Sequence, residues 1–495
     1  MAFNNIDLLV VIFFFLSMLL VGVFSYFRSK NSDDYFVAGG ELPWWLAGIS
    51  HHVSGHSGAV FVAYAAVAYT HGFTMYMWWA FPVGMVTIAS ARLFPVYWVR
   101  LRKRFQIQSP LEYLSVRYNI LTQQIVAWSG VFLKVLDVGA KWAAIGILLN
   151  VVGGIPMATG ILVSGIVTLV YVTFGGLWGV IVSDLIQFAV QIVGSILMFV
   201  LVLNRLGGIE SITGIWKKLP PGHSQLVNDP YTVSFVVIVC FLYFLTYNGG
   251  LWSLAARYIS SDTEKQASKA ARLSGVLYLV WPLILFFPMW AAPVILPGLT
   301  NPSESYGWLM LEILPQGMMG LVIASLFAAT MGMTSADVNT IAAVITRDIL
   351  PVVSPRRFRN DKHSLRTARI TTFIFALATI CIALNYESFG GVLGLIVNWF
   401  GALVGPTALP LLFGLLPIFK KCGPAAAITS IIGGLIAFVV TKKLDVNNLA
   451  LEVGSPIIVA ALIYVGMGLA TKATPVKVTG LFAALIKPTD KKTHD

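Results

Sequence analysis

Charged residues and cysteines are both scarce in this chain. Asp, Glu, Lys and Arg make up 11% of the 495 residues, hydrophobic residues make up 57%, and the mean hydropathy is +0.82. A water-soluble protein of this length needs far more charge on its surface, so a soluble fold is excluded. The three cysteines, Cys240, Cys381 and Cys422, stand alone in or beside apolar segments, which argues against disulfides and against a cysteine metal site.

The sequence motifs of common enzyme classes are also missing. No P-loop, dinucleotide fingerprint, nucleophile elbow or zinc motif is present, so a membrane-embedded enzyme is disfavoured and no cofactor is expected. The net charge of +12 does not indicate nucleic-acid binding, because Lys and Arg fall in loops beside apolar segments. The expected partners are membrane lipid, a small solute and a coupling cation, and the chain is compatible with a monomer.

Apolar segments long enough to cross a bilayer recur along the whole chain. We count about thirteen, which predicts an all-α polytopic membrane protein with a single transmembrane domain over residues 1–495. The first segment lacks a basic start, so no cleavable signal peptide is expected. The expected spans lie near Ile6–Tyr26, Trp44–Tyr69, 73–98, Ile125–Val151, Pro156–Val172, Gly179–Leu203, Thr232–Leu254, Leu273–Leu296, Gly317–Thr346, Ala368–Leu384, Gly390–Leu415, Ala425–Val440 and Pro456–Ala470.

The loop charges predict an orientation. Alternate loops carry basic residues, at Arg100–Arg104, Arg257–Arg272 and Arg347–Arg366, whereas the loops between them are nearly free of them. Because basic loops stay in the cytoplasm and an odd number of spans separates the termini, we expect the N-terminus outside and the C-terminus in the cytoplasm.

The segment from Trp44 to Tyr69 is interrupted by polar residues at mid-depth. Its centre, Ser50 to Gly58, holds three histidines, three serines and two glycines. Non-helical backbone inside a bilayer is tolerated only where it lines a cavity or is packed in protein, so we predict a broken helix at a binding site. A second polar break, Thr246 to Gly250, lies five spans later, and such a pair indicates an inverted repeat with the solute between the breaks.

Two acidic positions in or beside apolar segments are candidates for a cation or proton site. Asp184, near the cytoplasmic start of a span, can bind a cation or carry a proton; the alternative is an interfacial carboxylate that pairs with a basic loop. The second lies in the polar patch from Thr330 to Thr340, where Ser335 and Asn339 share a helix face. This patch is either functional or a seam between closely packed helices, but packing alone does not explain Asp337.

Lys134, Asp137 and Lys141 follow one another on one face of a predicted span. If Lys134 and Asp137 form a structural pair, Lys141 is left for an anion such as a solute carboxylate, unless its ammonium reaches the interface. His51, His52 and His56 either carry protons or are hydrogen-bonded packing residues. The candidate solute-binding residues in and around the two breaks are His52, Ser54, Gly55, Trp78, Trp79, Lys141, Tyr247, Asn248 and Trp252.

Five motifs together resemble the signatures of the sodium:solute symporter family. They are Asp33 to Gly40 (DDYFVAGG), Pro110 to Leu114 with Arg117 and Tyr118, Thr173 to Gln187, Arg257 to Ser260, and Asn339 with Thr346 and Asp348. The resemblance covers about Asp33 to Leu415. It implies sodium-driven alternating access and two inverted five-helix repeats with discontinuous first and sixth core helices. The repeats then span 44–203 and 231–415, with an extra helix and loop at 1–43 and further helices and a tail at 416–495.

The resemblance also implies two cation positions. The first lies between the carbonyl groups of Val53 and His56 and the helix that contains Ala329, but Gly332 and Met333 replace the paired hydroxyls of the family there. A thioether is a poor ligand for a hard cation. The second position would hold sodium at Asp184 and Ser335, with Thr334 as a further oxygen. The choice between sodium and a proton as coupling ion stays open.

The predicted function is cation-coupled symport of a small polar organic solute in a bacterial inner membrane. The solute is expected to be a sugar, a sugar acid or another carboxylate. Positions that bind sugar in the family's glucose carriers align with Gly55, Val60 and Trp79, which argues against glucose-like recognition, and Lys141 favours an acidic solute. The alternatives are a proton-coupled symporter and an uncoupled facilitator of the same fold.

Overall fold

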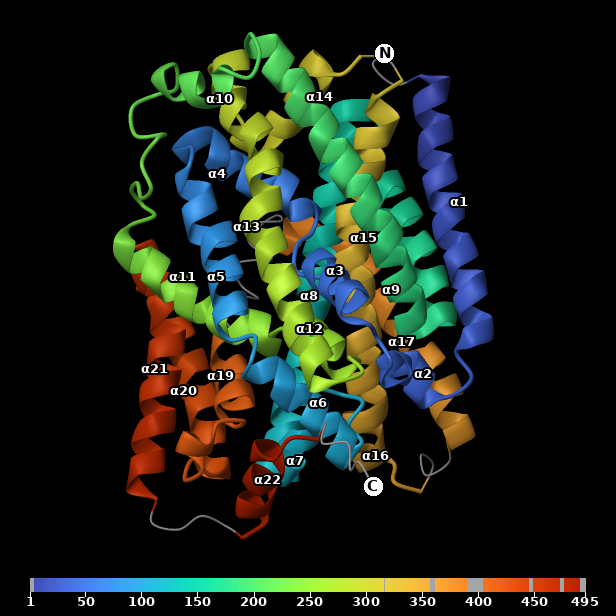
Figure 1. Ribbon diagram of the computed structural model, residues 1–495, viewed down its shortest axis with the longest axis vertical. Helices are drawn as coiled ribbons and strands as arrows, with labels where there is room; N and C mark the ends of the chain where they lie inside the picture. Colours follow the sequence, from blue (N-terminus) through green and yellow to red (C-terminus); the bar gives the residue numbers. More distant parts are fainter. Residues whose placement is uncertain are drawn as a thin grey trace.

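The structure is a computed structural model that describes residues 4–315, 317–356, 361–389, 404–444, 448–471 and 476–489 (Figure 1). These residues form helices and turns without a β-strand, which confirms the predicted all-α class. The helices are α1 (Asn5–Arg28), α2 (Ser32–Val37), α3 (Trp44–Val53), α4 (Ala63–His71), α5 (Phe81–Ala89), α6 (Phe94–Phe105), α7 (Glu112–Arg117), α8 (Ile120–Gly153), α9 (Met157–Leu206), α10 (Ser211–Gly214), α11 (Val233–Leu245), α12 (Trp252–Ile259), α13 (Glu264–Ile295), α14 (Ser305–Ile313), α15 (Met319–Val344), α16 (Leu350–Val353), α17 (Asp361–Leu384), α19 (Gly405–Phe413), α20 (Pro424–Lys443), α21 (Leu449–Ala470) and α22 (Val476–Ile486).

The number of spanning helices differs from the prediction. Within the described residues, nine helices are long and apolar enough to cross a membrane, or ten if the bent pair Tyr76–Ala89 and Phe94–Phe105 is one span. A count of about thirteen is therefore not confirmed. One reason is that α3 and α4, with 10 and 9 residues, are each too short alone. Another is that most of the predicted span Gly390–Leu415 lies outside the described residues.

Helix α9 contains two predicted spans, because the chain reverses inside it at Gly176. This glycine has φ 56° and ψ −148°, which a residue with a side chain rarely adopts. In a straight helix the 16 residues between Tyr171 and Gln187 would span about 24 Å. The Gln187 Nε2 atom instead lies 3.5 Å from the Tyr171 hydroxyl. The arms before and after Gly176 are therefore antiparallel neighbours.

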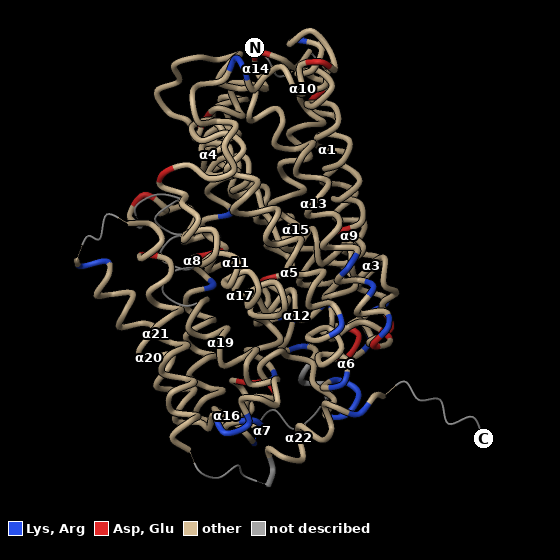
Figure 2. The backbone as a smooth tube through the Cα atoms, turned by 60° about the vertical axis from the view of Figure 1, so that its left-hand side comes forward, with Lys and Arg blue, Asp and Glu red and all other residues tan. Residues whose placement is uncertain are grey.

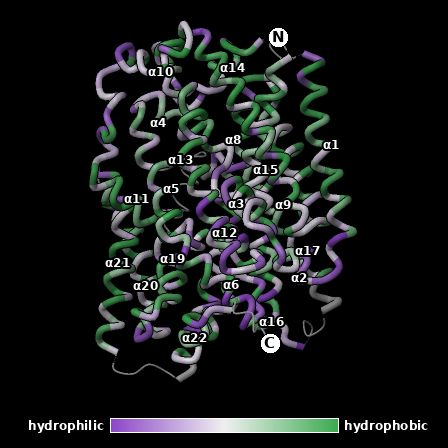
Figure 3. Tube along the Cα trace, in the orientation of Figure 1, coloured by the Kyte–Doolittle hydropathy of each residue, from purple (hydrophilic) through white to green (hydrophobic). Residues whose placement is uncertain are grey.

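Helix α15 is the central element of the fold. In its apolar window 94% of the residues are buried, and it packs on α9, α1, α8 and α17. The windows of α1, α20 and α21 are only 39, 28 and 33% buried. Figure 3 shows that these outer helices are mostly hydrophobic, whereas hydrophilic residues gather around α3 and α12 and at both ends. The polar residues of α15 therefore serve contacts inside the protein.

The two ends of the molecule differ in charge. Most Lys and Arg residues lie at the end that carries α6, α7, α16 and α22, as Figure 2 shows. The chain begins near the opposite end, where α1 starts, and α22 lies at the basic end (Figure 1). The start of α1 and helix α22 thus lie at opposite ends of the helix bundle (Figure 1).

Candidate functional site

The first predicted break is present. Helix α3 ends at Val53, and a non-helical stretch and the short turn η2 (Gly58–Phe61) separate it from α4, while Ser50 to Val53 are still helical. Gly55 is required here because a Cβ atom would lie 1.9 Å from the Tyr278 hydroxyl. The break is held by the His52 carbonyl, which accepts hydrogen bonds from Tyr278 Oη at 2.9 Å and from His56 Nδ1 at 3.0 Å.

The second predicted break is present as well. Between α11 and α12 the chain forms a π-turn, η5 (Thr246–Gly250), and Gly249 has φ 129°. Asn248 fixes this turn: its Oδ1 accepts from Ser90 at 2.6 Å, its Nδ2 donates to the Phe244 carbonyl at 2.8 Å, and its own carbonyl accepts from Trp98. The side chain of Asn248 therefore has a structural role, and its predicted contact with a solute would require these bonds to break.

The two breaks contact each other. The Tyr247 hydroxyl donates to the Gly55 carbonyl at 2.8 Å, and the Tyr247 carbonyl lies 3.2 Å from His51 Nε2. His51 Nδ1 lies 2.7 Å from the Ser274 hydroxyl of α13. Because a carbonyl oxygen can only accept, Nε2 carries a proton and donates to Tyr247, and Nδ1 shares a hydrogen bond with the Ser274 hydroxyl. His51 is thus a hydrogen-bonded packing residue that links the broken helices.

Asp184 lies in the second arm of α9 and pairs with Arg257 of α12. Both side chains are fully buried, with Arg257 Nη2 3.3 Å from Asp184 Oδ2. Ser50 of α3 bridges them, because its hydroxyl donates to Asp184 Oδ2 at 2.5 Å and accepts from Arg257 Nε at 2.9 Å. The prediction that Arg257 belongs to a basic loop is therefore wrong: the polar face of α12 carries it into the protein, where it neutralises Asp184.

Two oxygen atoms beside this pair lack a hydrogen-bond partner within the described structure. They are Asp184 Oδ1 and Gln187 Oε1, which come from one face of α9. Both face Gly332 of α15, since a Cβ atom there would lie 3.5 Å from Asp184 Oδ1 and 2.9 Å from Gln187 Oε1. The same Cβ atom would lie 2.4 Å from Val53 of α3. Buried acceptors without a donor are unfavourable unless a cation or water satisfies them.

The other predicted cation ligands come from the first break and from α15. No described donor reaches the main-chain carbonyl oxygens of Val53 and His56, so both can accept. Ser335 donates to the Gly332 carbonyl at 3.0 Å, and Thr334 donates to the Thr330 carbonyl at 2.8 Å. These hydroxyls keep a lone pair each. Ala329 lies fully buried on the same helix, α15.

Two side-chain oxygens of α9 therefore face Gly332 of α15, and the α3 atom nearest to a Cβ at this position is a methyl group of Val53. Carboxylate, amide and carbonyl oxygens are hard ligands that suit an alkali cation. Asp184 and Gln187 thus place two oxygens next to Gly332, where this chain has no side-chain hydroxyl. Gln187 was not among the predicted ligands, although its position three residues after Asp184 places it on the same helix face.

His52 and His56 form a second polar group at the first break. Both ring nitrogens of His52 lack a partner in the described structure, and its ring lies among Tyr278, Trp281 and Phe188, with centroids 4.4 to 5.9 Å away. His56 Nε2 lies 2.9 Å from the Gln191 amide oxygen. Since His56 Nδ1 already donates to a carbonyl, this second bond requires a charged ring or a turned amide.

The remaining predicted solute-binding residues do not all lie at the same site. Trp79 is buried against His56, Tyr64 and Tyr278, whereas Trp78 stacks on Tyr231, which in turn contacts His71. Ser54 is buried, and its hydroxyl interacts with the carboxylate of Asp184. Trp252 packs on Gly130 of α8, where a Cβ atom would lie 2.0 Å from the indole. Of this set, Ser54, Trp79 and Tyr247 lie closest to the first break.

Lys141 is not left over. Its ammonium lies 2.6 Å from Asp137 Oδ2 and 2.7 Å from Asp337 Oδ2, and Lys134 contacts the same two oxygens at 2.7 and 3.0 Å. The prediction of an unpaired Lys141 is therefore wrong. Asp337 comes from α15, 196 residues further along the chain, so its approach to Lys141 could not be seen in the sequence.

Comparison of the sequence with known proteins identifies the family of this chain. Residues 35–434 match the family model described as the sodium:solute symporter family. The chain is 26% identical to the sodium/sialic acid symporter SiaT of Proteus mirabilis, over 89% of this chain and 90% of that protein. It is 25% identical to the sodium/glucose cotransporter of Vibrio parahaemolyticus, over 82% of this chain and 78% of that protein.

Solved structures share the fold. A Na⁺-coupled sialic acid symporter in a substrate-bound, outward-open state aligns with a TM-score of 0.84 and 21% identity, over 95% of this chain and 99% of that one. The nucleobase-cation symporter Mhp1 aligns with a TM-score of 0.58 and 13% identity, over 91% and 98% of the two chains. The helix arrangement is thus that of secondary transporters and not of an enzyme. The chain belongs to the sodium:solute symporter family.

Proposed function

We propose that this protein couples sodium entry to the uptake of a small polar organic solute, with sodium bound among α3, the second arm of α9, and α15. The observation that carries the proposal is the pair of unpartnered buried oxygens, Asp184 Oδ1 and Gln187 Oε1, that face Gly332. The carbonyl groups of Val53 and His56 and the hydroxyls of Ser335 and Thr334 are the other ligand candidates. The likeness to sodium-coupled relatives supports the same ion.

The contacts of Asp184 also suggest how ion and solute are linked. Asp184 on α9 holds Ser50 of the first broken helix and Arg257 of the second. An ion that binds Asp184 Oδ1 therefore changes the charge next to both helices. Tyr247 joins the two breaks through its contacts with Gly55 and His51. Ion binding at Asp184 therefore acts on the region between the breaks, where we expect the solute. The proposed repeats, 44–203 and 231–415, place one broken helix in each half, as alternating access by rocking of the repeats requires.

A proton is the second candidate for the coupling ion. It is favoured by His52, whose ring nitrogens have no described partner, and by the hydrogen bond between His56 and Gln191. When the His56 ring is charged, its Nε2 donates to the Gln191 amide oxygen; when the ring is neutral, the amide must turn and donate to Nε2. These rings lie at the first break, so a proton there also adjoins the solute region. The fold is compatible with alternating access driven by either sodium or a proton. Transport assays with imposed ion gradients distinguish the two.

Uptake into proteoliposomes tests the proposal. The purified protein is assayed with sialic acid, glucose and pantothenate, the solutes named for its relatives, under an imposed sodium gradient, an imposed pH gradient, or neither. Accumulation with the sodium gradient alone supports the proposal. Accumulation with the pH gradient supports the proton, and equilibration without either indicates a facilitator.

A binding assay tests the ion site without knowledge of the solute. A ligand that binds only the folded state raises the unfolding temperature. Sodium chloride is expected to stabilise the protein more than potassium or choline chloride, and Gln187→Leu is expected to remove this difference. Arg205→Gln, in an exposed ion pair with Glu312, is the matched control that should keep it.

We also propose that the protein lies in a bacterial inner membrane with the N-terminus outside and the C-terminus in the cytoplasm. The support is the gathering of Lys and Arg at the end that carries α6, α7, α16 and α22 (Figure 2). A C-terminal fusion to green fluorescent protein is expected to fluoresce, and a fusion to alkaline phosphatase is expected to be inactive. The reverse pattern would contradict this orientation.

A further inference from the structure

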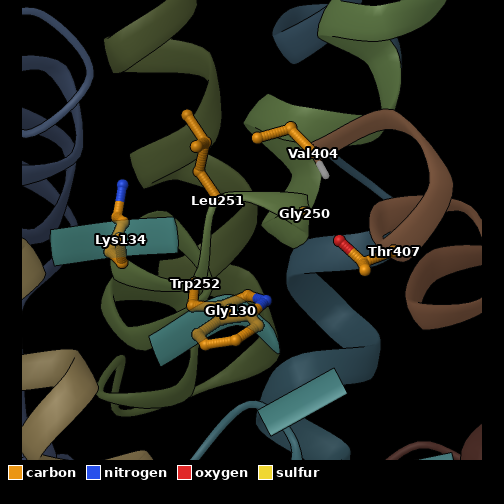
Figure 4. A pocket seen from close by; sticks show the side chains of 7 residues that line it. All are labelled: Gly130, Lys134, Gly250, Leu251, Trp252, Val404 and Thr407. Carbon is orange, nitrogen blue, oxygen red and sulfur yellow. The ribbon is translucent and has the colours of Figure 1, made fainter. Parts of the chain in front are cut away.

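The basic residues around the two helix breaks have acidic partners. Lys134 and Lys141 contact an aspartate at 2.7 and 2.6 Å, and Arg257 contacts another at 3.3 Å. Lys134 also lines a small cavity at the second break, together with Trp252 and Thr407 (Figure 4). The positive charges near the breaks are therefore neutralised by carboxylates of the same chain, as buried charges require.

Three arginines on the outer surface differ, because they form no ion pair within the described residues. Arg28 is the last residue of α1, and Arg366 and Arg369 lie in the first three turns of α17. Both helices have these ends at the basic end of the bundle, beside α2 (Figure 1). The Nε atom of Arg369 is buried and has no hydrogen-bond partner in the described structure. Such a donor is unfavourable unless a group from outside the chain satisfies it.

Aromatic rings position two of these arginines. The guanidinium carbon of Arg28 lies 4.0 Å from the centroid of the Trp178 ring, and that of Arg369 lies 4.5 Å from the centroid of Tyr26. Tyr26 in turn contacts Phe174 edge-on, with 6.0 Å between the centroids. Phe174 and Trp178 lie on either side of the reversal in α9, so the tip of this hairpin takes part in both contacts. A guanidinium over a ring keeps its in-plane N–H groups free to bind an anion.

The surface next to the arginines is apolar and exposed. On α17, four side chains that are 45 to 60% exposed follow Arg366 on the same helix face: Ile370, Phe373, Ile374 and Leu377. Phe174 of α9 is also exposed. In a membrane such side chains face the acyl chains. Helix α17 thus presents positive charge at its start and then an apolar stripe, which matches a phospholipid from its headgroup to its chains.

We propose that this surface binds an anionic phospholipid, with the phosphate on the arginines and the acyl chains along α17. We name it the arginine patch, which consists of Arg28, Arg366 and Arg369 with the rings of Tyr26, Phe174 and Trp178. Basic clusters at the cytoplasmic ends of transmembrane helices bind anionic headgroups. The proposal goes beyond the proposed transport function and depends on neither the ion nor the solute. The proposed orientation places the lipid in the cytoplasmic leaflet.

The chemistry of the patch favours a lipid with a net negative charge. Guanidinium groups bind phosphate oxygens through paired N–H groups, and these bonds are strong where little water competes. A zwitterionic headgroup carries its own ammonium, which competes with the arginines for the phosphate. A free phosphate ion makes no contact with the apolar stripe of α17, so it gains less than a lipid does.

Thermal unfolding with added lipid tests the proposal. Protein that is purified in detergent and freed of lipid is heated with phosphatidylglycerol, with phosphatidylcholine of the same acyl chains, or with inorganic phosphate. A ligand that binds only the folded state raises the unfolding temperature. Phosphatidylglycerol is expected to raise it more than phosphatidylcholine does, and inorganic phosphate is expected to have no effect. Equal effects of the two lipids would overturn the proposal, and so would an effect of inorganic phosphate as large as that of phosphatidylglycerol.

Variants assign the effect to the arginine patch. Arg28→Gln with Arg369→Gln removes two of its charges and is expected to weaken the binding of phosphatidylglycerol, measured by titration, by about tenfold or more. Arg28→Lys with Arg369→Lys should keep part of the binding, since the charge remains. Lys420→Gln with Lys421→Gln is the matched control, because it removes two charges from exposed positions at the same end of the bundle. Unaltered phosphatidylglycerol binding in the folded glutamine double variant would overturn the proposal.

Arg366 offers a variant that leaves the packing of the fold intact. Its side chain is exposed and makes no hydrogen bond in the described structure. Arg366→Gln is expected to weaken phosphatidylglycerol binding by about fivefold and to leave the unfolding temperature in phosphatidylcholine unchanged. If the glutamine double variant does not fold, this single variant decides, and unaltered binding in it would overturn the role of the patch.

Discussion

The guanidinium of Arg257 lies 3.3 Å from the carboxylate of Asp184, and neither side chain is exposed to solvent. This pair joins the second broken helix to the second arm of α9, and Ser50 adds the first broken helix through its hydroxyl. The two broken helices and the second arm of α9 thus meet at one buried ion pair. We therefore expect Asp184 to contribute to folding as well as to the proposed ion site.

Replacing Asp184 by Asn separates these two roles. The single variant leaves the buried Arg257 without a counter-charge, and removal of one partner from a buried pair costs about 3–5 kcal/mol. Asp184→Asn is therefore expected to lower the unfolding temperature clearly, and Asp184→Asn with Arg257→Gln should regain most of the loss. Both variants should lack stabilisation by sodium. A single variant as stable as the parent protein would show that the ion pair contributes nothing to folding.

Gly332 offers a second test, because serine there would restore a hydroxyl that the family uses. The Cβ atom of such a serine would lie 2.4 Å from Val53 Cγ1 and 2.9 Å from Gln187 Oε1, so it displaces a proposed ligand. Overpacking of this kind costs about 1–3 kcal/mol. Gly332→Ser is expected to weaken sodium-dependent stabilisation. Gly332→Ser with Val53→Ala removes the closer of the two clashes but not the contact with Gln187, so it should recover part of the stabilisation. Stronger sodium binding in the single variant would place the ion elsewhere.

The sequence was sufficient to locate both broken helices. Polar residues and glycine at mid-depth of an apolar segment are costly in a bilayer, so their presence at Ser50–Gly58 and Thr246–Gly250 indicated non-helical backbone. The same reasoning singled out Asp184. These predictions needed only local composition and the thickness of a membrane, and the structure confirms both breaks.

The partners of these residues could not be predicted, because they come from distant parts of the chain. Arg257 looked like a loop residue until the structure placed it against Asp184, 73 residues earlier. Lys141 looked unpaired because Asp337 is 196 residues away. The resemblance to a family supplied the expected cation positions, but the role of Gln187 required the distances around Gly332.

His51 provides a prediction about the contact between the two breaks. Its ring joins Ser274 on α13 to the Tyr247 carbonyl, and both bonds are buried. His51→Phe leaves these groups without a partner, which costs about 1–3 kcal/mol for a buried polar group. The unfolding temperature should fall accordingly. His71→Gln, at a half-buried helix end, is the control and should stay within about 0.5 kcal/mol of the parent protein. Equal stability of both variants would contradict the bridging role.

Arg100 provides a prediction about the C-terminal segment. Its guanidinium binds both carboxylate oxygens of Glu264, at 2.9 and 2.7 Å, and donates to the carbonyl groups of Leu485 and Ile486 at the end of α22. Glu264 in turn accepts from the Thr489 main-chain nitrogen at 2.7 Å. Because hydrogen bonds to charged groups contribute about 1.5–3 kcal/mol, Arg100→Gln should speed amide exchange in residues 476–489 by about ten- to a hundredfold. Hydrogen–deuterium exchange with mass spectrometry measures this, and Arg205→Gln at the opposite end should not alter that segment. Unchanged exchange in Arg100→Gln would mean that other contacts hold α22 in place.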